Sequence, residues 1–187
     1  MTPSLNKRTP PDDLDLDISS MMRVYLMRHG IAIDRGDPDS PPEAERYLTP
    51  KGIERTRAAA YGLRALKIRP KTLLTSPLVR AVQTAEIVCD VLNLDPKRLK
   101  AMDALKPESK PARLAEELSQ FADDQDVMCF GHAPQLDDFI ALAVRAPAPC
   151  TELRKAGVAC LEIGSLSPLR ASLLWLATPR LLRRLAG

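Results

Sequence analysis

The chain has 187 residues, of which 45% are hydrophobic, and a formal net charge of +3 at pH 7. This length fits one domain with a sizeable core. The small excess of dispersed basic residues and an aromatic content of only 4% argue against nucleic-acid binding. No apolar run reaches membrane-spanning length, so no membrane partner is expected.

The N-terminal segment, residues 1–20, mixes prolines with a cluster of aspartates and contains few large apolar groups. This composition predicts a disordered tail, followed by a single domain over residues 21–187. Met21 and Met22 stand immediately before the first predicted strand, so initiation at either would remove nothing that the fold is expected to need.

Both histidines of the chain follow short apolar runs. The run RVYLMRHG (residues 23–30) predicts a buried strand that ends in Arg28 and His29, and VMCFGH (127–132) predicts another that ends before His132. In open α/β sheets, ligands bind beyond the carboxyl ends of the strands. If the two strands lie near each other in one parallel sheet, both imidazoles reach the same edge.

Between these runs, residues 31–47 form a loop rich in Asp, Pro and Glu. Thr49 and Pro50 are a cap and a first helical residue, and they predict a helix to about residue 66, with Ile53, Ala60 and Leu63 on one side.

Ser76 and Pro77 repeat this signal and open a helix with an apolar stripe. Arg80 lies in its first turn, off the stripe.

Short strands are also predicted at 71–75 and 98–102, helices at 111–121 and after Pro134, and a β-hairpin from 158–163 and 171–177. Strands that alternate with helices favour an α/β fold: a three-layer α/β/α sandwich whose central sheet is mostly parallel, with an antiparallel edge strand. The arginines that follow the hairpin, Arg180, Arg183 and Arg184, could meet an acidic partner, but the sequence favours solvated charges.

Four residues share one kind of position: Arg28, His29 and His132 just past strands, and Arg80 at the start of a helix. Singly, each is more often structural or solvated. Together they suit a dianion, because arginine forks bind phosphate oxygens and a helix N-terminus adds N–H donors.

Two other kinds of site fit the residues poorly. A zinc site usually has a third protein ligand and local His spacing, and the adjacent arginines would repel a cation, so no metal and no other cofactor is expected. A serine hydrolase is not supported, because the chain has no G-x-S-x-G motif.

The cysteines lack metal-ligand spacing, and three of them lie in apolar patterns, which favours a reducing cytoplasm. They are Cys89, Cys129, Cys150 and Cys160.

Four ordered motifs carry a resemblance that covers nearly the whole chain from Met22 onward. They are LMRHG (26–30), LTPKG (48–52), SPLVRAVQTA (76–85) and GHAP (131–134). The chain resembles the histidine phosphatase superfamily, also called phosphoglycerate mutase-like, with its RHG signature. Because it lacks a cap insertion, the chain is most similar to the small SixA-type phosphohistidine phosphatases.

The resemblance implies that His29 is a nucleophile that forms a phosphohistidine intermediate. A backbone carbonyl that accepts from its other ring nitrogen would fix the tautomer. Arg28, Arg80 and His132 would bind the equatorial phosphate oxygens. Arg46 resembles an arginine that SixA-type members place near the phosphate, although a solvated charge is an equally good interpretation.

One feature departs from the family pattern. Many members supply a carboxylic acid that protonates the leaving oxygen. The segment 99–108 contains Asp103 and Glu108 as possible acids but no clear match, and Ala104 stands in the expected place. This departure favours a phosphoramidate substrate, whose imidazole leaves readily once protonated.

The sequence therefore predicts a metal-independent phosphatase acting on phosphohistidine in a signalling protein, such as a phosphotransfer domain. The alternative is a phosphatase or mutase of a small phosphorylated metabolite. A non-catalytic phosphate-binding module is less favoured, because binding alone does not need His29.

Overall fold

The structure is a computed structural model that describes residues 21–121 and 126–187. The segment 1–20, predicted as a tail, lies outside the described residues. Within the described part of the chain, no helix is both long and apolar enough to cross a membrane.

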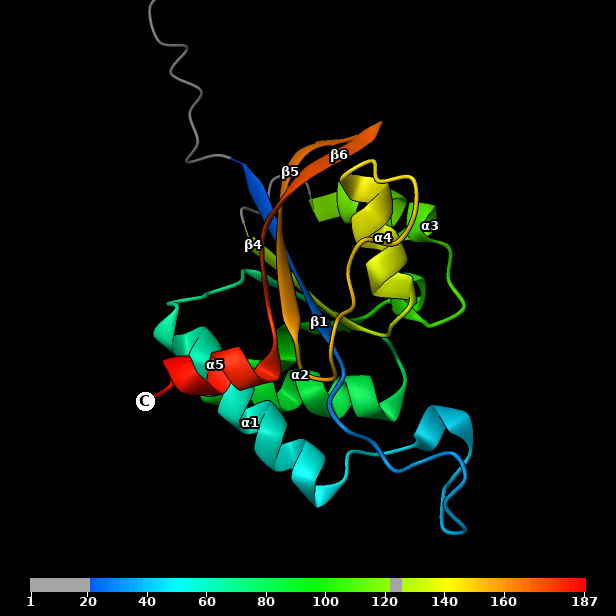
Figure 1. Ribbon diagram of the computed structural model, residues 1–187, viewed down its shortest axis with the longest axis vertical. Coiled ribbons are helices and arrows are strands. Elements are labelled where there is room, and N and C mark those ends of the chain that lie inside the picture. The colour runs from blue at the N-terminus through cyan, green and yellow to red at the C-terminus, as the bar shows by residue number, and fades with distance from the viewer. Residues whose placement is uncertain (1–20, 122–125) are drawn as a thin grey trace, which may run out of the picture.

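A six-stranded sheet forms the centre of the molecule, with the strand order β3-β2-β4-β1-β5-β6 (Figure 1). The strands are β1 (Met22–Arg28), β2 (Thr72–Thr75), β3 (Leu99–Ala101), β4 (Asp126–Gly131), β5 (Val158–Leu166) and β6 (Leu169–Ala177). Strands β3, β2, β4 and β1 pair in parallel, whereas β5 pairs antiparallel with β1 and β6 antiparallel with β5. The predicted sheet, mostly parallel with an antiparallel edge, is confirmed, and a two-stranded hairpin forms that edge.

Helices cover both faces of this sheet, as the predicted three-layer sandwich requires. Their bounds are α1 (Pro50–Ala65), α2 (Val79–Leu92), α3 (Pro111–Leu118), α4 (Gln135–Ala143) and α5 (Pro179–Leu185). Helices α1, α2 and α5 contribute to one hydrophobic cluster and α3 and α4 to the other, on opposite faces (Figure 1).

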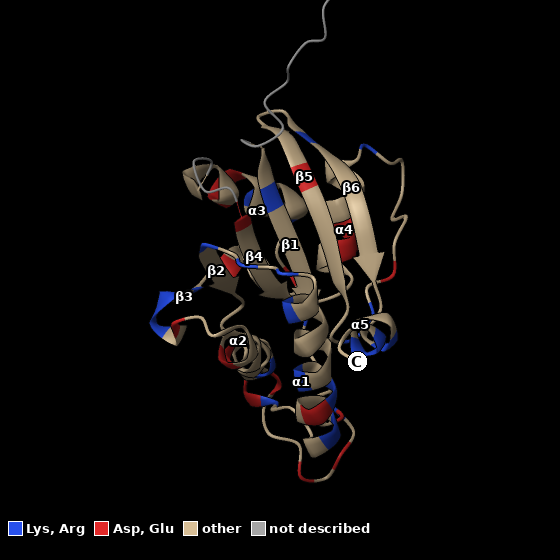
Figure 2. Cartoon of the chain, turned by 90° about the vertical axis from the view of Figure 1, so that its left-hand side faces the viewer, with Lys and Arg blue, Asp and Glu red and all other residues tan. Residues whose placement is uncertain are grey.

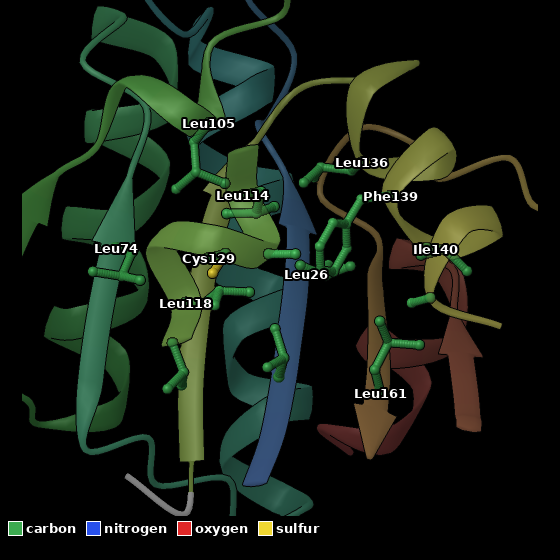
Figure 3. Close-up of a cluster of buried hydrophobic side chains, with 14 of the residues drawn as sticks. Leu26, Leu74, Leu105, Leu114, Leu118, Cys129, Leu136, Phe139, Ile140 and Leu161 are labelled. Atoms are coloured by element: carbon green, nitrogen blue, oxygen red, sulfur yellow. The ribbon is translucent and has the colours of Figure 1, made fainter. Parts of the chain in front are cut away.

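Strand β1 is buried on both of its faces. Leu26 packs with Cys129 and Phe139 in the cluster under α3 and α4 (Figure 3), whereas Tyr25 and Met27 belong to the cluster on the other face. Burial on both faces explains why the sequence of β1 is a continuous apolar run without alternation.

Helix α1 begins at the predicted cap, because Thr49 Oγ1 accepts a hydrogen bond from the Gly52 amide at 3.0 Å and Pro50 is the first helical residue. Its C-terminal part packs directly on α5. A Cβ atom at Gly62 would overlap the Leu182 carbonyl, so glycine permits this close approach. Leu182 is fully buried and fixes α5 against the domain.

Candidate active site

The two histidines meet at the carboxyl ends of neighbouring parallel strands. Arg28 of β1 lies opposite Gly131 of β4 in the strand register, and the His29 amide donates to the Gly131 carbonyl at 3.0 Å. His29 and His132 immediately follow Arg28 and Gly131 in the sequence, and their ring centroids are 5.1 Å apart with an interplanar angle of 54°. The topology thus brings together the two imidazoles that the sequence predicted to share one edge.

His29 is held as a neutral imidazole with a defined tautomer. Its Nδ1 lies 2.7 Å from the Gly30 carbonyl oxygen, which can only accept, so Nδ1 carries the proton and Nε2 keeps a free lone pair. Burial lowers the pKa of His29 to about 2, and the neighbouring His132, Arg80 and Arg28 act in the same direction. A buried imidazole with a free Nε2 lone pair is suited to act as a nucleophile.

His132 is also neutral. Burial, followed by the charge of Arg80, lowers its pKa to about 3. Its Nε2 lies 2.9 Å from the Ser76 hydroxyl, where β2 leads into α2. Its Nδ1 is buried and has no hydrogen-bond partner among the described residues.

Arg80 is anchored by Glu43, a residue that the sequence analysis did not single out. Its Nη1 donates to the Glu43 carbonyl at 2.8 Å and its Nη2 to Glu43 Oε1 at 2.9 Å. Arg46 Nη1 donates to Glu43 Oε2 at 2.8 Å, and Arg35 binds both carboxylate oxygens. Hydrogen bonds from Arg35 and Arg46, together with the charge of Arg80, lower the pKa of Glu43 to about 2, so it stays ionised at neutral pH.

Backbone carbonyls also hold Arg46 and Arg28 in place. Arg46 Nε donates to the Ile33 carbonyl at 3.0 Å, and its side chain is only 11% exposed, which does not fit a solvated loop charge. Arg28 Nη1 donates to the Leu153 carbonyl at 2.8 Å, while its buried Nε has no partner in the part of the chain that the structure describes.

These side chains surround a cavity of about 260 Å³. Among the described residues, its lining comprises Arg28, His29, Asp34, Arg35, Arg46, Arg80, Pro107, His132, Ala133 and Lys155. Burial and positive charge prepare such a cavity for a compact dianion.

The two possible acids do not reach this cavity. Asp103 and Glu108 line a different cavity, where Asp103 forms an ion pair with Lys106 at 2.8 Å. Asp34 is the one carboxylate that lines the histidine cavity among residues 21–121 and 126–187. In the same residues, no group of three or more His, Cys, Asp or Glu side chains could hold a metal ion.

The site thus consists of a neutral imidazole that faces a second imidazole among fixed guanidinium groups, at the strand ends of an α/β sandwich. The chain belongs to the histidine phosphatase superfamily, because the sequence profile of its branch 1 matches residues 24–156. An uncharacterized protein of Picosynechococcus is 35% identical over 147 residues, which cover 77% of this chain and 87% of that protein.

SixA-like relatives appear among both sequences and structures, as the motifs predicted. Phosphohistidine phosphatase SixA of Escherichia coli is 37% identical over 86 residues, covering 46% of this chain and 50% of SixA. The structure of the protein histidine phosphatase SixA complexed with tungstate superposes with a TM-score of 0.76 and 25% identity, covering 85% of this chain and 98% of that one. A putative α-ribazole-5′-phosphate phosphatase of Escherichia coli shares the fold, with a TM-score of 0.68 and 19% identity over 84% of this chain and 97% of that one.

Proposed function

We propose that this chain is a metal-independent phosphatase that removes the phosphoryl group from phosphohistidine in a signalling protein. The observation that carries the proposal is the combination of a neutral nucleophile with the absence, among the described residues of the site, of a carboxyl group aligned to protonate a poor leaving group. The four cysteines, all free in the structure, support action in the reducing cytoplasm.

In the first step, His29 Nε2 attacks the phosphorus atom in line, and the bond from phosphorus to the substrate's imidazole nitrogen breaks. The leaving imidazole takes a proton from solvent water on its other ring nitrogen and departs as a neutral ring. Arg28, Arg46 and Arg80 neutralise the three equatorial oxygens, and the free Nδ1 of His132 lies at the same site. In the second step, water attacks the phosphohistidine, the bond to His29 breaks, and inorganic phosphate is released.

The choice of substrate follows from the carboxylates near the site. Glu43, with its pKa lowered to about 2, carries no proton at neutral pH, and it is engaged by arginines on both oxygens. Asp103 and Glu108 lie elsewhere. An alkoxide leaving group needs a proton from a positioned acid, whereas the P–N bond of phosphohistidine is labile.

A phosphatase of small phosphate monoesters is the second candidate, and one observation favours it. Asp34 lines the site cavity, and a monoester phosphatase would need it to protonate the leaving alkoxide. Its Oδ1 already accepts a hydrogen bond from the Gly36 amide at 2.9 Å in the loop, which argues for a structural role instead.

The test compares kcat/KM, with a chelator present, on a histidine-phosphorylated phosphotransfer domain and on a set of phosphate monoesters. The proposal predicts a large preference for the domain that persists in Asp34→Asn and is lost in His29→Ala. A preference for monoesters that Asp34→Asn abolishes would instead establish the metabolite phosphatase.

A further inference from the structure

A second, larger cavity adjoins the histidine cavity. It has a volume of about 670 Å³, and Arg28 and Lys155 line both cavities. Its other lining residues come from three segments and from Ile31. Arg55 belongs to α1, Glu152, Arg154 and Ala156 to the segment before β5, and Pro179, Arg180 and Arg183 to α5. A substrate bound to His29 therefore has this cavity directly beside it.

Positive charge dominates the second cavity. Its described lining contains six Lys or Arg side chains and a single carboxylate, Glu152, which forms an ion pair with Arg154 at 2.6 Å. The other five basic groups form no ion pair with the residues that the structure describes. In Figure 2, α1 and α5 lie side by side at this end of the sheet, and both helices carry stretches coloured blue for Lys and Arg.

The walls of this cavity are held in place by the fold. The Ala156 amide donates to the Arg28 carbonyl at 3.0 Å, which ties the segment before β5 to the end of β1. Leu182, buried on the inner side of α5, and the close contact at Gly62 fix the helix that carries Arg180 and Arg183. These side chains are thus presented from a defined surface and not from a loose terminus.

The chemistry of the lining indicates what it binds. Small-molecule pockets are lined mainly by apolar and aromatic side chains, but the described lining here has no aromatic residue, and six of its ten side chains are Lys or Arg. Unpaired cations on three segments are complementary to several carboxylates spread over a protein surface.

We infer that this cavity docks an acidic segment of the protein that carries the phosphohistidine, so that Arg55, Arg180 and Arg183 select the substrate beyond its phosphoryl group. The inference rests on the proposed function and adds the partner's chemistry to it. Arg180 and Arg183, for which the sequence favoured solvated charges, thereby acquire a partner.

The test uses charge reversal with a matched control on the same helix. Arg183 lines the cavity, whereas the exposed Arg184 does not, and both lie in the last turn of α5, where a reversal has the same effect on the helix dipole. Arg183→Glu and Arg55→Glu are each expected to raise KM for the phosphorylated phosphotransfer domain about fivefold at low salt. An increase of this size is typical when an exposed charge pair becomes repulsive. Arg184→Glu should leave KM within about twofold of the parent protein.

Two further measurements isolate docking from chemistry. Hydrolysis of phosphoramidate, a small P–N substrate, should be unchanged in all three variants. Binding of the unphosphorylated domain, measured by titration calorimetry, should weaken in Arg183→Glu and Arg55→Glu, and also when the carboxylates flanking the domain's histidine are changed to amides.

The outcomes separate the two proposals. Equal KM values and equal binding in Arg183→Glu and Arg184→Glu would overturn the docking site while leaving the phosphatase intact, as would an equal loss on phosphoramidate. If the parent protein hydrolyses neither P–N substrate, the proposed function fails, and the binding titrations still decide whether the acidic segment docks here. Binding of a polyphosphate in place of the domain, abolished by Arg183→Glu, would reassign the cavity to a small anion.

Discussion

Two buried imidazoles that remain neutral make the stability of the protein depend on pH. Unfolded histidines have a pKa near the ordinary value of 6.5, whereas His29 and His132 in the folded protein have pKa values of about 2 and about 3. Below the unfolded pKa, the unfolded state binds more protons than the folded state. The free energy of unfolding is therefore expected to fall by about 2 kcal/mol per histidine between about pH 7.5 and about pH 5.

Urea titrations at the two pH values measure this fall. A His29→Gln/His132→Gln double variant serves as the control, because it has no imidazole to protonate and should lose most of the pH dependence in this interval. Identical pH dependence in both proteins would contradict the lowered pKa values.

The carboxylate of Glu43 organises the arginines at the edge of the site. In Glu43→Ala, Arg35, Arg46 and Arg80 lose a common acceptor, and kcat/KM is expected to fall about 10- to 100-fold, as expected for the loss of charged hydrogen bonds. Steady-state kinetics check this, with Glu45→Ala, an exposed carboxylate in the same turn, as the unchanged control. A rise in activity in Glu43→Ala would show that the carboxylate competes with the phosphoryl group.

The sequence could locate the histidines because strand ends encode their positions. The helix start predicted at Ser76 and Pro77 is wrong, because α2 begins at Val79 after Leu78 and no side chain caps it, yet Arg80 still lies in the first turn. Glu43 could not be found this way, because the loop 31–47 contains several carboxylates and only its tertiary contact with α2 selects one of them. Asp103 was a reasonable candidate by position. The short 3-10 helix Asp103–Leu105 buries Ala104 and Leu105, however, and turns Asp103 outward toward Lys106.

At the level of elements, strong capping signals predicted α1 well, but its buried face less well. Ile53, expected on the buried side with Ala60 and Leu63, is 40% exposed. The face that packs is built largely from small residues, including Ala59 and Gly62, and small residues give a weak amphipathic signal. The hairpin strands β5 and β6 also extend further than the predicted ranges 158–163 and 171–177, because a shift in their register between Ile163 and Ser165 accommodates Gly164 within β5.

The contact between α1 and α5 yields a prediction that separates helix propensity from packing. Gly62→Ala gains up to about 1 kcal/mol in helix propensity, but the new methyl group overlaps the Leu182 carbonyl. We expect a net destabilisation of up to about 2 kcal/mol, since overpacking costs about 1–3 kcal/mol.

Thermal and urea unfolding measure this change. Ala58→Gly, on the same helix and only partly buried, calibrates the propensity contribution. A Gly62→Ala protein more stable than its parent would show that α5 does not require this close approach.

At the scale of the whole molecule, the cysteines report on the integrity of both core clusters. Cys89, Cys129 and Cys160 are buried, and burial raises their pKa values to about 11, about 12 and about 12, whereas Cys150 is exposed. A thiol reagent at neutral pH is expected to modify Cys150 rapidly and the other three only after unfolding.

Counting modified thiols with and without denaturant checks this expectation. In Cys150→Ser, the native protein should show no rapid reaction. Rapid modification of a second thiol in the native protein would mean that one of the two core clusters opens readily.

The layers of the fold were predictable from alternating strands and helices, but the order of the strands was not. Nothing local in the sequence states that β4 lies between β1 and β2, because this order depends on crossovers that pack as whole units. The expectation that both histidines reach one edge held because β4 occupies this position next to β1.

The pairing of Arg28 with Gly131 in the β1–β4 register has one more consequence. Because side chains alternate between the faces of a strand, a slip of a single residue would exchange the two core clusters and turn one imidazole away from the other. A misaligned sheet could retain its secondary structure and compactness, yet it would have no paired histidines. In refolding experiments, recovered turnover would therefore count the correctly aligned molecules, which circular dichroism alone cannot distinguish from their misaligned counterparts.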